Sequence, residues 1–315
     1  MTMEKPSFIQ EKIRLAPFTT YQIGGPAEYF VQVESLQQLD QVWQWTRANN
    51  LVVRYLGGGS NLLIADEGVG GLVIALPAVN PTIDGLKITV GAGCSLSRLV
   101  NEAVDNGLAG LEWAAGIPGQ VGGAVRGNAG AFGGWIADNL VEVVAYNFKT
   151  NTLEKFSQAE CQFAYRHSIF KERPELLIWS VSFALKNGQK EELQAIAESH
   201  RQYRREKHPL LPSAGCIFKN ALVTEVAIKS PELLAKAEAV KATGRGEVPA
   251  GFIVEQAGLS GLAIAKAQVS PQHSNFLVNN GGATAKEMRT LIEKVQAEVR
   301  QKYKLELILE VAFWP

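Results

Sequence analysis

The sequence predicts a mixed α and β protein of the α+β class. Short runs rich in β-branched residues, such as residues 52–56 and 71–76, are separated by glycine-rich turns, which is typical of strands. Other segments place apolar residues at helical spacing behind capping residues. The helical pattern over residues 190–207 ends just before Pro209, and we place the main domain boundary there. The 315 residues suffice for two or three domains.

The first predicted helix begins at Ser35. Gln38, three residues later, completes the pattern of a capping box, and Leu36, Leu39 and Trp43 share one helical face. The elements expected next, in chain order, are strands at 52–56, 71–76 and 86–91, a helix at 95–107, a hairpin of strands 140–148 and 152–157, and a strand at 175–185.

The region after the boundary predicts a second set of helices and strands. Thr284 and Glu287 form a capping box at the start of a long helix, and residues 305–311 alternate apolar and other residues, which predicts a closing strand. The apolar stripe expected on the long helix is Met288, Leu291, Ile292, Val295 and Val299. The other elements expected here are helices at 231–242 and 250–257 and a strand at 275–279.

Charge and cysteine content exclude several classes of function. Lys+Arg 31 balances Asp+Glu 31, so no bulk field draws the protein onto nucleic acid or an anionic membrane, and we expect neither as a partner. No apolar run approaches the roughly 20 residues that span a bilayer, and the N-terminus lacks a signal-like apolar core, so we expect a cytoplasmic protein. Cys94, Cys161 and Cys216 are odd in number and far apart, so we expect neither a disulfide framework nor a metal site.

A first glycine cluster, Gly57 to Leu62 (GGGSNL), follows a predicted strand. Three successive glycines let the backbone turn tightly and bring its N–H groups toward an anion, and Ser60 and Asn61 add donors. The cluster matches neither the P-loop nor the dinucleotide-binding GxGxxG pattern. A phosphate site and a plain turn both remain open as explanations.

A second cluster, Gly116 to Gly134, holds eight glycines together with Pro118 and Asn128. Such density costs chain entropy, which indicates that something approaches this backbone closely. Bulges or glycine-packed helix ends would be the ordinary structural explanation. The two clusters together would suit a large ligand that has a pyrophosphate and a flat ring.

Seven segments in order resemble the UDP-N-acetylenolpyruvoylglucosamine reductase family from about Thr19 to the C-terminus. They are TTYQIGGPAEYF, YLGGGSNLLI, GIPGQVGGAVRGNAGAFG, YRHSIFK, SAGCIFKN, HSNFLVN and LILEV. The resemblance implies an FAD-binding domain of the PCMH (vanillyl-alcohol-oxidase) type and a C-terminal α/β substrate-binding domain. It implies two α/β FAD-binding subdomains at residues 1–70 and 71–208 and the substrate-binding domain at 209–315. The short stretch between Arg166 and Cys216 resembles the subclass that lacks an extra substrate loop.

The resemblance implies the reduction of UDP-N-acetylglucosamine enolpyruvate to UDP-N-acetylmuramate in peptidoglycan precursor synthesis. NADPH would reduce FAD, and the flavin N5 would deliver hydride to the alkene, leaving an enolate that needs positive charge and a proton. Gly57, Gly58, Gly59, Ser60, Asn61 and Leu62 would wrap the FAD pyrophosphate. Ile117, Pro118, Gly119, Gly122, Gly123, Asn128, Ala129 and Gly130 would line the rest of the cofactor.

Three residues would carry the chemistry by this resemblance. Arg166 would stabilise the enolate with its guanidinium fork, although an arginine in this setting is more often a solvated surface residue. Glu310 would act as an acid or polariser, although alternation along residues 305–311 also explains it as an exposed carboxylate on a half-buried strand. Cys216 would donate the proton, although a free cysteine is most often a small buried thiol, the fate we expect for the other two cysteines.

Four residues are expected to bind substrate or nicotinamide. The resemblance assigns pocket shape to Tyr165, phosphate contacts to Lys207, and contacts near the substrate diphosphate and sugar to Asn220 and His273. Cations in the last turn of a helix also complement the helix dipole, and this effect by itself would explain a lysine at position 207. We expect a monomer.

Two other functions remain open at this stage. One is a PCMH-type FAD oxidase that acts on a small alcohol with oxygen as acceptor. No specific histidine for covalent flavin attachment is evident, and the C-terminal segments favour the reductase. The other is a non-catalytic nucleotide-binding module, which would bind a UDP-sugar without flavin.

Overall fold

The computed structural model describes residues 3–315, apart from the side chain of Arg245, and it falls into two compact units. Unit 1 comprises the chain up to Ile13, Ala27–Gly58 and Gly70–Arg204. Unit 2 comprises Arg14–Pro26, Gly59–Val69 and Arg205–Pro315. The chain therefore passes between the units several times, once within the first glycine cluster. The assignment of three domains stays a prediction.

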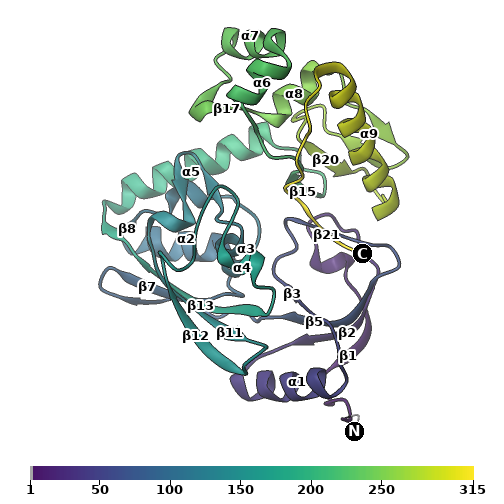
Figure 1. Cartoon of the computed structure of the whole chain (residues 1–315). Coiled ribbons are helices and arrows are strands. Elements are labelled where there is room, and N and C mark those ends of the chain that lie inside the picture. The colour runs from purple at the N-terminus through teal and green to yellow at the C-terminus, as the bar shows by residue number, and fades with distance from the viewer. Residues whose placement is uncertain (1–2) are drawn as a thin grey trace. The chain divides into compact units, whose positions relative to one another are not determined.

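Unit 1 contains a four-stranded sheet in the order β1-β2-β5-β3, which begins near the N-terminus (Figure 1). Strands β3 and β5 are parallel, with Val53 opposite Leu72. The strands are β1 (Gln10–Arg14), β2 (Pro26–Gln32), β3 (Val53–Leu56) and β5 (Val69–Ala75). Helix α1 (Leu36–Ala48) has Ser35 as its N-cap, as predicted, and buries Leu39, Val42 and Trp45 in the core of this region.

A second sheet of unit 1 is antiparallel, in the order β12-β11-β13-β7-β6. The predicted hairpin is confirmed, since Asn147 pairs with Thr152 across a turn in which Asn151 has φ +60. The strands are β6 (Thr82–Asp84), β7 (Lys87–Gly91), β11 (Leu140–Asn147), β12 (Thr152–Ser157) and β13 (Leu176–Ala184). Helices α2 (Leu96–Asp105), α3 (Val121–Arg126), α4 (Ile169–Glu172) and α5 (Lys190–Lys207) complete the region.

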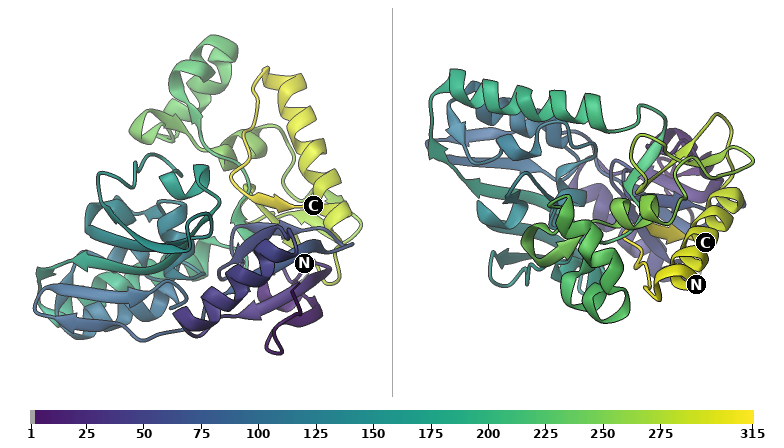
Figure 2. Two further views of the ribbon diagram at one scale, coloured as in Figure 1. Left: turned by 60° about the horizontal axis from the view of Figure 1, so that its bottom comes forward. Right: turned by 90° about the horizontal axis from the view of Figure 1, so that it is seen from above.

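Helices α2, α3 and α5 cover one face of this antiparallel sheet (Figures 1 and 2). Leu99, Val125 and Ala197 of α2, α3 and α5 share one core with Val143 and Val181 of the sheet. Short paired strands lie at the edges of this region: β8 (Leu108–Ala109) with β14 (Lys186–Asn187), and β9 (Gly130–Ala131) with β10 (Gly134–Trp135). Single 3₁₀ turns occupy Ala16–Phe18, Glu112–Ala114, Ile136–Asp138 and Gly244–Gly246 along the whole chain.

Unit 2 is built on a four-stranded sheet in the order β15-β20-β19-β18, against which α9 packs (Figure 2). The predicted capping box is confirmed, because Thr284 accepts from the N–H of Glu287 at 3.1 Å and Glu287 accepts from the N–H of Thr284 at 3.1 Å. The predicted apolar stripe of α9 is buried in the core of unit 2. The sheet strands are β15 (Ser213–Cys216), β18 (Ala263–Ile264), β19 (Ala267–Val269) and β20 (Phe276–Asn279). The helices of unit 2 are α6 (Val223–Lys229), α7 (Pro231–Ala239), α8 (Ala250–Gln256) and α9 (Ala285–Tyr303). Two further pairs of strands are β16 (Ala221–Leu222) with β17 (Glu247–Val248), and β4 (Leu62–Ile64) with β21 (Ala312–Trp314).

The predicted closing strand at residues 305–311 is wrong. Leu305 and Leu307 are buried as the alternation required, but the segment makes a single bridge, between Leu309 and Phe218. The carbonyl of Leu307 accepts instead from the side chain of Gln296 at 2.8 Å. The last strand is β21, which runs parallel to β4.

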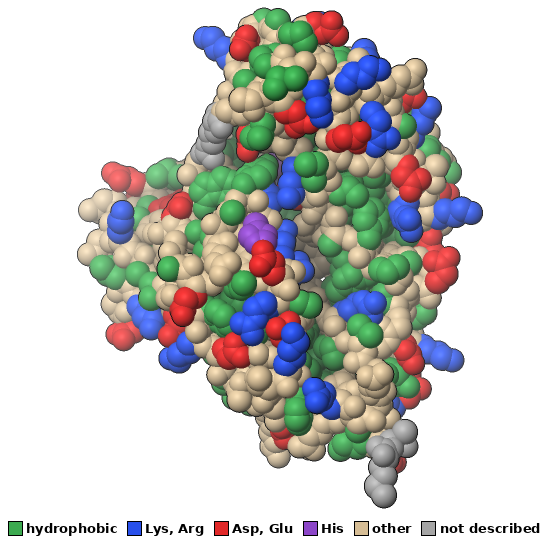
Figure 3. Space-filling model, in the orientation of Figure 1, with side chains coloured by type: hydrophobic (Ala, Val, Ile, Leu, Met, Phe, Trp, Pro, Cys, Tyr) green, Lys and Arg blue, Asp and Glu red, His purple; other side chains and the backbone are tan. Residues whose placement is uncertain are grey.

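Two smaller differences concern helices. Gln38 does not close its capping box on the N-cap residue, because its side chain accepts from the N–H of Glu34 at 2.8 Å. Helices α3, α4 and α6 were not expected, and α7 ends three residues before the expected 242. No helix in the described part of the chain combines the length and apolarity needed to cross a bilayer. Charged side chains of both signs are interspersed over the face shown in Figure 3, in keeping with the balanced composition.

Candidate functional site

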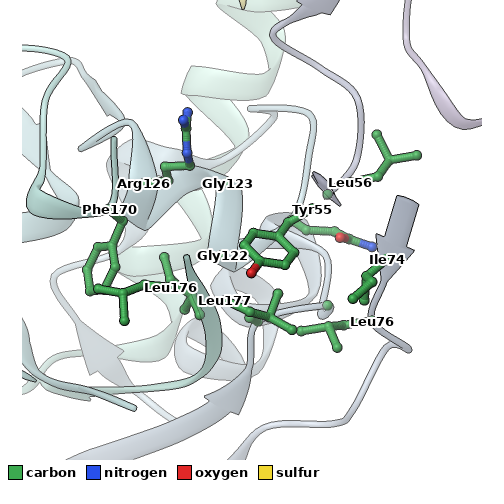
Figure 4. A pocket seen from close by; sticks show the side chains of 15 residues that line it. Tyr55, Leu56, Ile74, Leu76, Gly122, Gly123, Arg126, Phe170, Leu176 and Leu177 are labelled. Carbon is green, nitrogen blue, oxygen red and sulfur yellow. The ribbon is translucent and has the colours of Figure 1, made fainter. Parts of the chain in front are cut away.

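A pocket lies in unit 1 beside α3 (Figure 4). It holds about 500 Å³ of empty space, open solvent at its mouth included. Most of its lining side chains are apolar, and none of the lining residues is Asp or Glu. The lining residues are Tyr55, Leu56, Gly57, Ile74, Leu76, Ala92, Gly93, Gln120, Gly122, Gly123, Arg126, Phe170, Leu176, Leu177 and Ile178.

Glycines of both clusters lie at this pocket, but the reason for glycine differs between positions. A Cβ on Gly58 would lie 2.8 Å from the Cα of Gly119, so backbone packing requires glycine there. A Cβ on Gly122 would lie 2.9 Å from the Cβ of Ala92. A Cβ on Gly123 would meet nothing within 4 Å. The ordinary packing explanation therefore accounts for Gly58 and Gly122 and leaves Gly123 facing open space.

Helix α3 forms inside the second cluster because it buries one apolar side against the core, through Val121 and Val125. The first two N–H groups of this helix are already engaged. Val121 donates to the carbonyl of Cys94 at 2.9 Å, and Gly122 donates to the carbonyl of Ala92 at 2.9 Å. These two amides are therefore not available to a bound anion.

Arg166 lies at the tip of a tight turn in unit 1. Ala164 and His167 exchange two backbone hydrogen bonds across this turn, and Arg166 has φ +54, the left-handed region that few non-glycine residues adopt. Its guanidinium lies over the ring of Tyr165, 5.6 Å from the ring centroid. Lys171 donates to the carbonyl of Arg166 at 2.7 Å. The turn is therefore held by several contacts in a conformation that costs energy.

Asn128 connects the second glycine cluster to that turn. Its side-chain nitrogen donates to the carbonyl of Ala164 at 3.0 Å, and its side-chain oxygen accepts from the N–H of Ala137 at 3.2 Å. The side chain is buried. Arg166 itself donates to the carbonyl of Gly130 at 3.3 Å. The predicted cofactor segment and the predicted catalytic arginine are thus neighbours within unit 1.

Cys216 is the last residue of β15 in unit 2 and is half-buried. It pairs with Phe276, whereas Ser213 pairs with Val278, so β15 carries one extra residue in a bulge. Gly215 in this bulge has φ +75, which favours glycine. Bulges of this kind re-aim a neighbouring side chain, in this case Cys216. Sequence alone did not indicate this geometry.

Glu310 lies beside the same strand. Its N–H donates to the carbonyl of Ile217 at 2.8 Å, directly after Cys216, and its own carbonyl accepts from the side chain of Asn61 at 3.1 Å. The carbonyl of Asn61 in turn accepts from the N–H of Ala312 at 3.1 Å. Unit 2 therefore brings together Asn61, Cys216 and Glu310, which lie far apart in the sequence.

The remaining predicted residues of unit 2 differ in their surroundings. Asn220 donates to the Glu247 carboxylate at 2.9 Å and accepts from the N–H of Ala250 at 3.2 Å, so both ends of its amide have protein partners. His273 Nδ1 accepts from the N–H of Asn275 at 3.3 Å, and burial lowers the pKa of His273. Lys207 is exposed at the end of α5.

The predicted site residues fall into two sets. Unit 1 contains Gly57, Gly58, Ile117, Pro118, Gly119, Gly122, Gly123, Asn128, Ala129, Gly130, Tyr165 and Arg166. Unit 2 contains Gly59, Ser60, Asn61, Leu62, Lys207, Cys216, Asn220, His273 and Glu310. Their roles toward substrate and cofactor stay predictions.

Sequence reasoning missed several residues that line the pocket. Tyr55 lies two residues before Gly57, the start of the first glycine cluster, and its hydroxyl donates to the carbonyl of Glu175 at 3.2 Å. Burial raises the pKa of Tyr55. Phe170 belongs to the same segment as Arg166, and Arg126 lies inside the second cluster. A long charged side chain within a run of small residues was the one available signal for Arg126.

Comparisons with known proteins show, first, the class to which this protein belongs. The model of an FAD binding domain matches residues 27–154. A VAO-type flavoprotein from Myceliophthora thermophila, 9% identical, superposes with a TM-score of 0.51 over 88% of this chain and 70% of that chain, which supports the fold alone. The predicted class, a PCMH-type FAD-binding domain with a further α/β domain, is confirmed.

The family follows from the rest of the chain. The model of the UDP-N-acetylenolpyruvoylglucosamine reductase C-terminal domain matches residues 205–314. Reductases of this name from Synechococcus sp. (strain WH7803) and Carboxydothermus hydrogenoformans are 38% and 35% identical, over 96% and 99% of this chain and 92% and 95% of theirs. The crystal structure of the Thermus caldophilus reductase, 36% identical, has a TM-score of 0.77 over 98% of this chain and 100% of that chain. The chain belongs to the UDP-N-acetylenolpyruvoylglucosamine reductase family, and the predicted resemblance is confirmed.

As a member of this family the protein is an oxidoreductase whose cofactors are FAD and NADPH. The pocket of unit 1 fits a part of FAD. It is apolar enough to take a flat ring, Gly123 opens toward its interior, and Arg126 supplies positive charge with no acidic residue in the lining to oppose an anion.

Proposed function

We propose that this protein reduces UDP-N-acetylglucosamine enolpyruvate to UDP-N-acetylmuramate, a step of peptidoglycan precursor synthesis. The match of residues 205–314 to a reductase C-terminal domain carries the proposal, since an FAD-binding domain alone occurs in many enzymes. We assign FAD binding to residues 1–70 and 71–208 and substrate binding to residues 209–315. When bound, FAD supplies the redox chemistry, accepting a hydride from NADPH and giving one to the terminal alkene carbon of the substrate.

Arg166 stabilises the negative charge that develops on the substrate. Addition of hydride to the terminal carbon leaves an electron pair on the carbon beside the carboxylate, delocalised as an enolate. A guanidinium grips such a planar anion with two parallel hydrogen bonds. The turn around Arg166 supports this role, because Asn128 and Lys171 hold its backbone in place before any substrate arrives.

Cys216 provides the proton that completes the reaction. Its Sγ–H transfers a proton to the enolate carbon, which leaves a thiolate that solvent reprotonates after product release. A thiol with a reference pKa of about 8.5 holds its proton at pH 7 and is acidic enough to give it to a carbanion. Glu310 polarises the same region, and the hydrogen bond from its N–H to the Ile217 carbonyl supports a position next to Cys216.

Four further residues contact substrate or NADPH in this proposal. Tyr165 shapes the pocket beside Arg166. Lys207 contacts phosphates, and its exposed position at the end of α5 is compatible with a ligand. Asn220 and His273 lie near the substrate diphosphate and sugar. For Asn220 such a contact would add to, or replace, its hydrogen bonds to Glu247 and Ala250.

The test is a flavin spectrum followed by a coupled assay. The purified protein should be yellow and should release FAD on denaturation. It should oxidise NADPH rapidly only when the enolpyruvyl UDP-sugar is present, with one UDP-N-acetylmuramate formed per NADPH. A yellow protein that consumes oxygen with a small alcohol and ignores the enolpyruvyl substrate would instead be an oxidase. A colourless protein that binds UDP-sugars would refute flavin-dependent reduction.

A further inference from the structure

Arg126 lines the candidate cofactor pocket, and neither the family resemblance nor the comparisons assign it a role. It is the last residue of α3, and its side chain projects from the helix beside the pocket (Figure 4). Gly122 and Gly123 precede it by four and three positions, so all three share one helical face. Val121 and Val125 face the core instead. The helix therefore presents one open position, Gly123, and one guanidinium to the pocket.

The guanidinium of Arg126 has no partner of its own. Throughout residues 3–315 the structure contains no hydrogen bond, ion pair or ring contact made by this side chain, leaving aside the side chain of Arg245. Arg173 of the same unit, by contrast, lies 3.3 Å from both Glu154 and Glu175. Arg126 differs from Arg173 in that no carboxylate lines its surroundings.

Two observations on the exposure of Arg126 fit together. Its side chain is exposed to solvent, yet the surrounding protein desolvates the guanidinium enough to lower its pKa. A side chain that stands in the mouth of a concave pocket satisfies both, since protein surrounds it while solvent still reaches it. A partly desolvated cation without a counter-ion is unfavourable, and a bound anion relieves this cost.

The first two amides of α3 do not supply this neutralisation. The N–H groups of Val121 and Gly122 already donate to carbonyls of residues 94 and 92. Within the lining of the pocket Arg126 is the one charged side chain. The lining also includes an apolar floor with Phe170, Leu176 and Leu177, from which the guanidinium points away in Figure 4. A flat ring joined to a phosphate matches this combination of an apolar floor and one cation.

We propose that Arg126 is a cofactor-binding residue whose guanidinium grips a phosphate of the FAD diphosphate while the apolar floor takes a ring of the cofactor. The inference rests on FAD occupying this pocket, as in the proposed function. It deepens that function by naming the group that neutralises the diphosphate. Arginine suits this role because its planar fork matches two phosphate oxygens.

The test compares flavin retention and affinity in three variants of the full chain. Arg126→Gln removes the charge, Arg126→Lys keeps it without the fork, and Arg98→Gln removes an exposed charge on α2 that does not line the pocket. Each purified protein is diluted and ultrafiltered repeatedly, and its remaining flavin is measured. Flavin-depleted protein is then titrated with FAD by fluorescence quenching at low and at high salt, with thermal unfolding as a check on folding.

Arg126→Gln should weaken FAD binding by roughly 10- to 100-fold, the value of a hydrogen bond to a charged group. The loss should shrink at high salt, because screening weakens the parent's ionic contact. The affinity of Arg126→Lys for FAD should lie between those of the parent and Arg126→Gln. The affinity of Arg98→Gln should match that of the parent. Competition with ADP, adenosine, FMN and riboflavin identifies the half of FAD concerned: the substitution should weaken either ADP or FMN and leave adenosine and riboflavin unchanged.

Two results would overturn the inference while leaving the proposed function intact. One is an Arg126→Gln protein that binds FAD as tightly as the parent. The other is an equal loss of affinity for phosphorylated and unphosphorylated ligands, which would indicate packing rather than phosphate recognition. A parent protein that binds no FAD would instead overturn the proposed function itself.

Discussion

Substitution of Gly123 separates a glycine required by the fold from a glycine required by a ligand. A Cβ at this position meets nothing within 4 Å, and Gly123 is not among the residues with positive φ, so alanine fits the protein without strain. Glycine inside a helix costs about 1 kcal/mol relative to alanine. The free energy of unfolding of the flavin-free Gly123→Ala variant should therefore equal or exceed that of the parent by up to about 1 kcal/mol.

The same substitutions should weaken FAD binding, because the new side chain projects into the pocket. Valine adds three carbon atoms where the cofactor is expected. Overpacking of this kind typically costs about 1–3 kcal/mol, which corresponds to a roughly 5- to 150-fold higher Kd for FAD. Alanine adds one carbon atom and should have a smaller effect. The expected signature is a protein that is at least as stable and yet poor in flavin.

Two matched controls make the experiment decisive. Gly122→Val places a side chain against Ala92, whose Cβ lies 2.9 Å from the new Cβ, so this variant should be destabilised. Gly70→Val has its nearest atom, an oxygen of Glu28, at 3.6 Å and lies outside the pocket lining, so it should bind FAD normally. Thermal unfolding by circular dichroism and FAD titration of flavin-depleted protein provide the two measurements. A folded Gly123→Val protein with the parent Kd for FAD would refute the assignment of this pocket.

Three further predictions concern the proposed chemistry. Arg166→Lys should retain FAD and leave NADPH-driven flavin reduction nearly unchanged, while substrate reduction slows by roughly 10- to 100-fold because the guanidinium fork is lost. Equal slowing of both half-reactions in stopped-flow traces would contradict this role of Arg166. Cys216→Ala should leave flavin reduction unchanged and slow turnover of the enolpyruvyl substrate by roughly 10²- to 10⁴-fold, with partial recovery in Cys216→Ser. If the alanine variant turns over at the rate of the parent, Cys216 is a packing residue and not the proton donor. Thiol labelling of the native protein at pH 8 should modify Cys216 first, because Cys94 and Cys161 are buried. Burial also raises the pKa of Cys161 to about 12, which keeps its thiol neutral and unreactive. Rapid modification of two or three thiols, counted by mass spectrometry, would contradict the buried positions of Cys94 and Cys161.

Local sequence patterns predicted the elements whose stability depends on nearby residues. The capping box of Thr284 and Glu287 formed as expected, because its partners are three residues apart and need no tertiary contact. The hairpin around Asn151 formed for the same reason. The closing strand failed, since a strand needs a long-range partner and Gln296 takes one of the carbonyls that a ladder would have used.

By itself the sequence determined the family, the fold class and the two glycine clusters, because order, spacing and residue type are sufficient for each. Only the tertiary structure decided which glycines pack against protein and which face the pocket, as Gly122 and Gly123 show. Only the tertiary structure placed Glu310 beside Cys216 and left Arg126 without a carboxylate. These properties depend on distances between residues far apart in the chain. Since no local pattern encodes such distances, they become visible only once the backbone is folded.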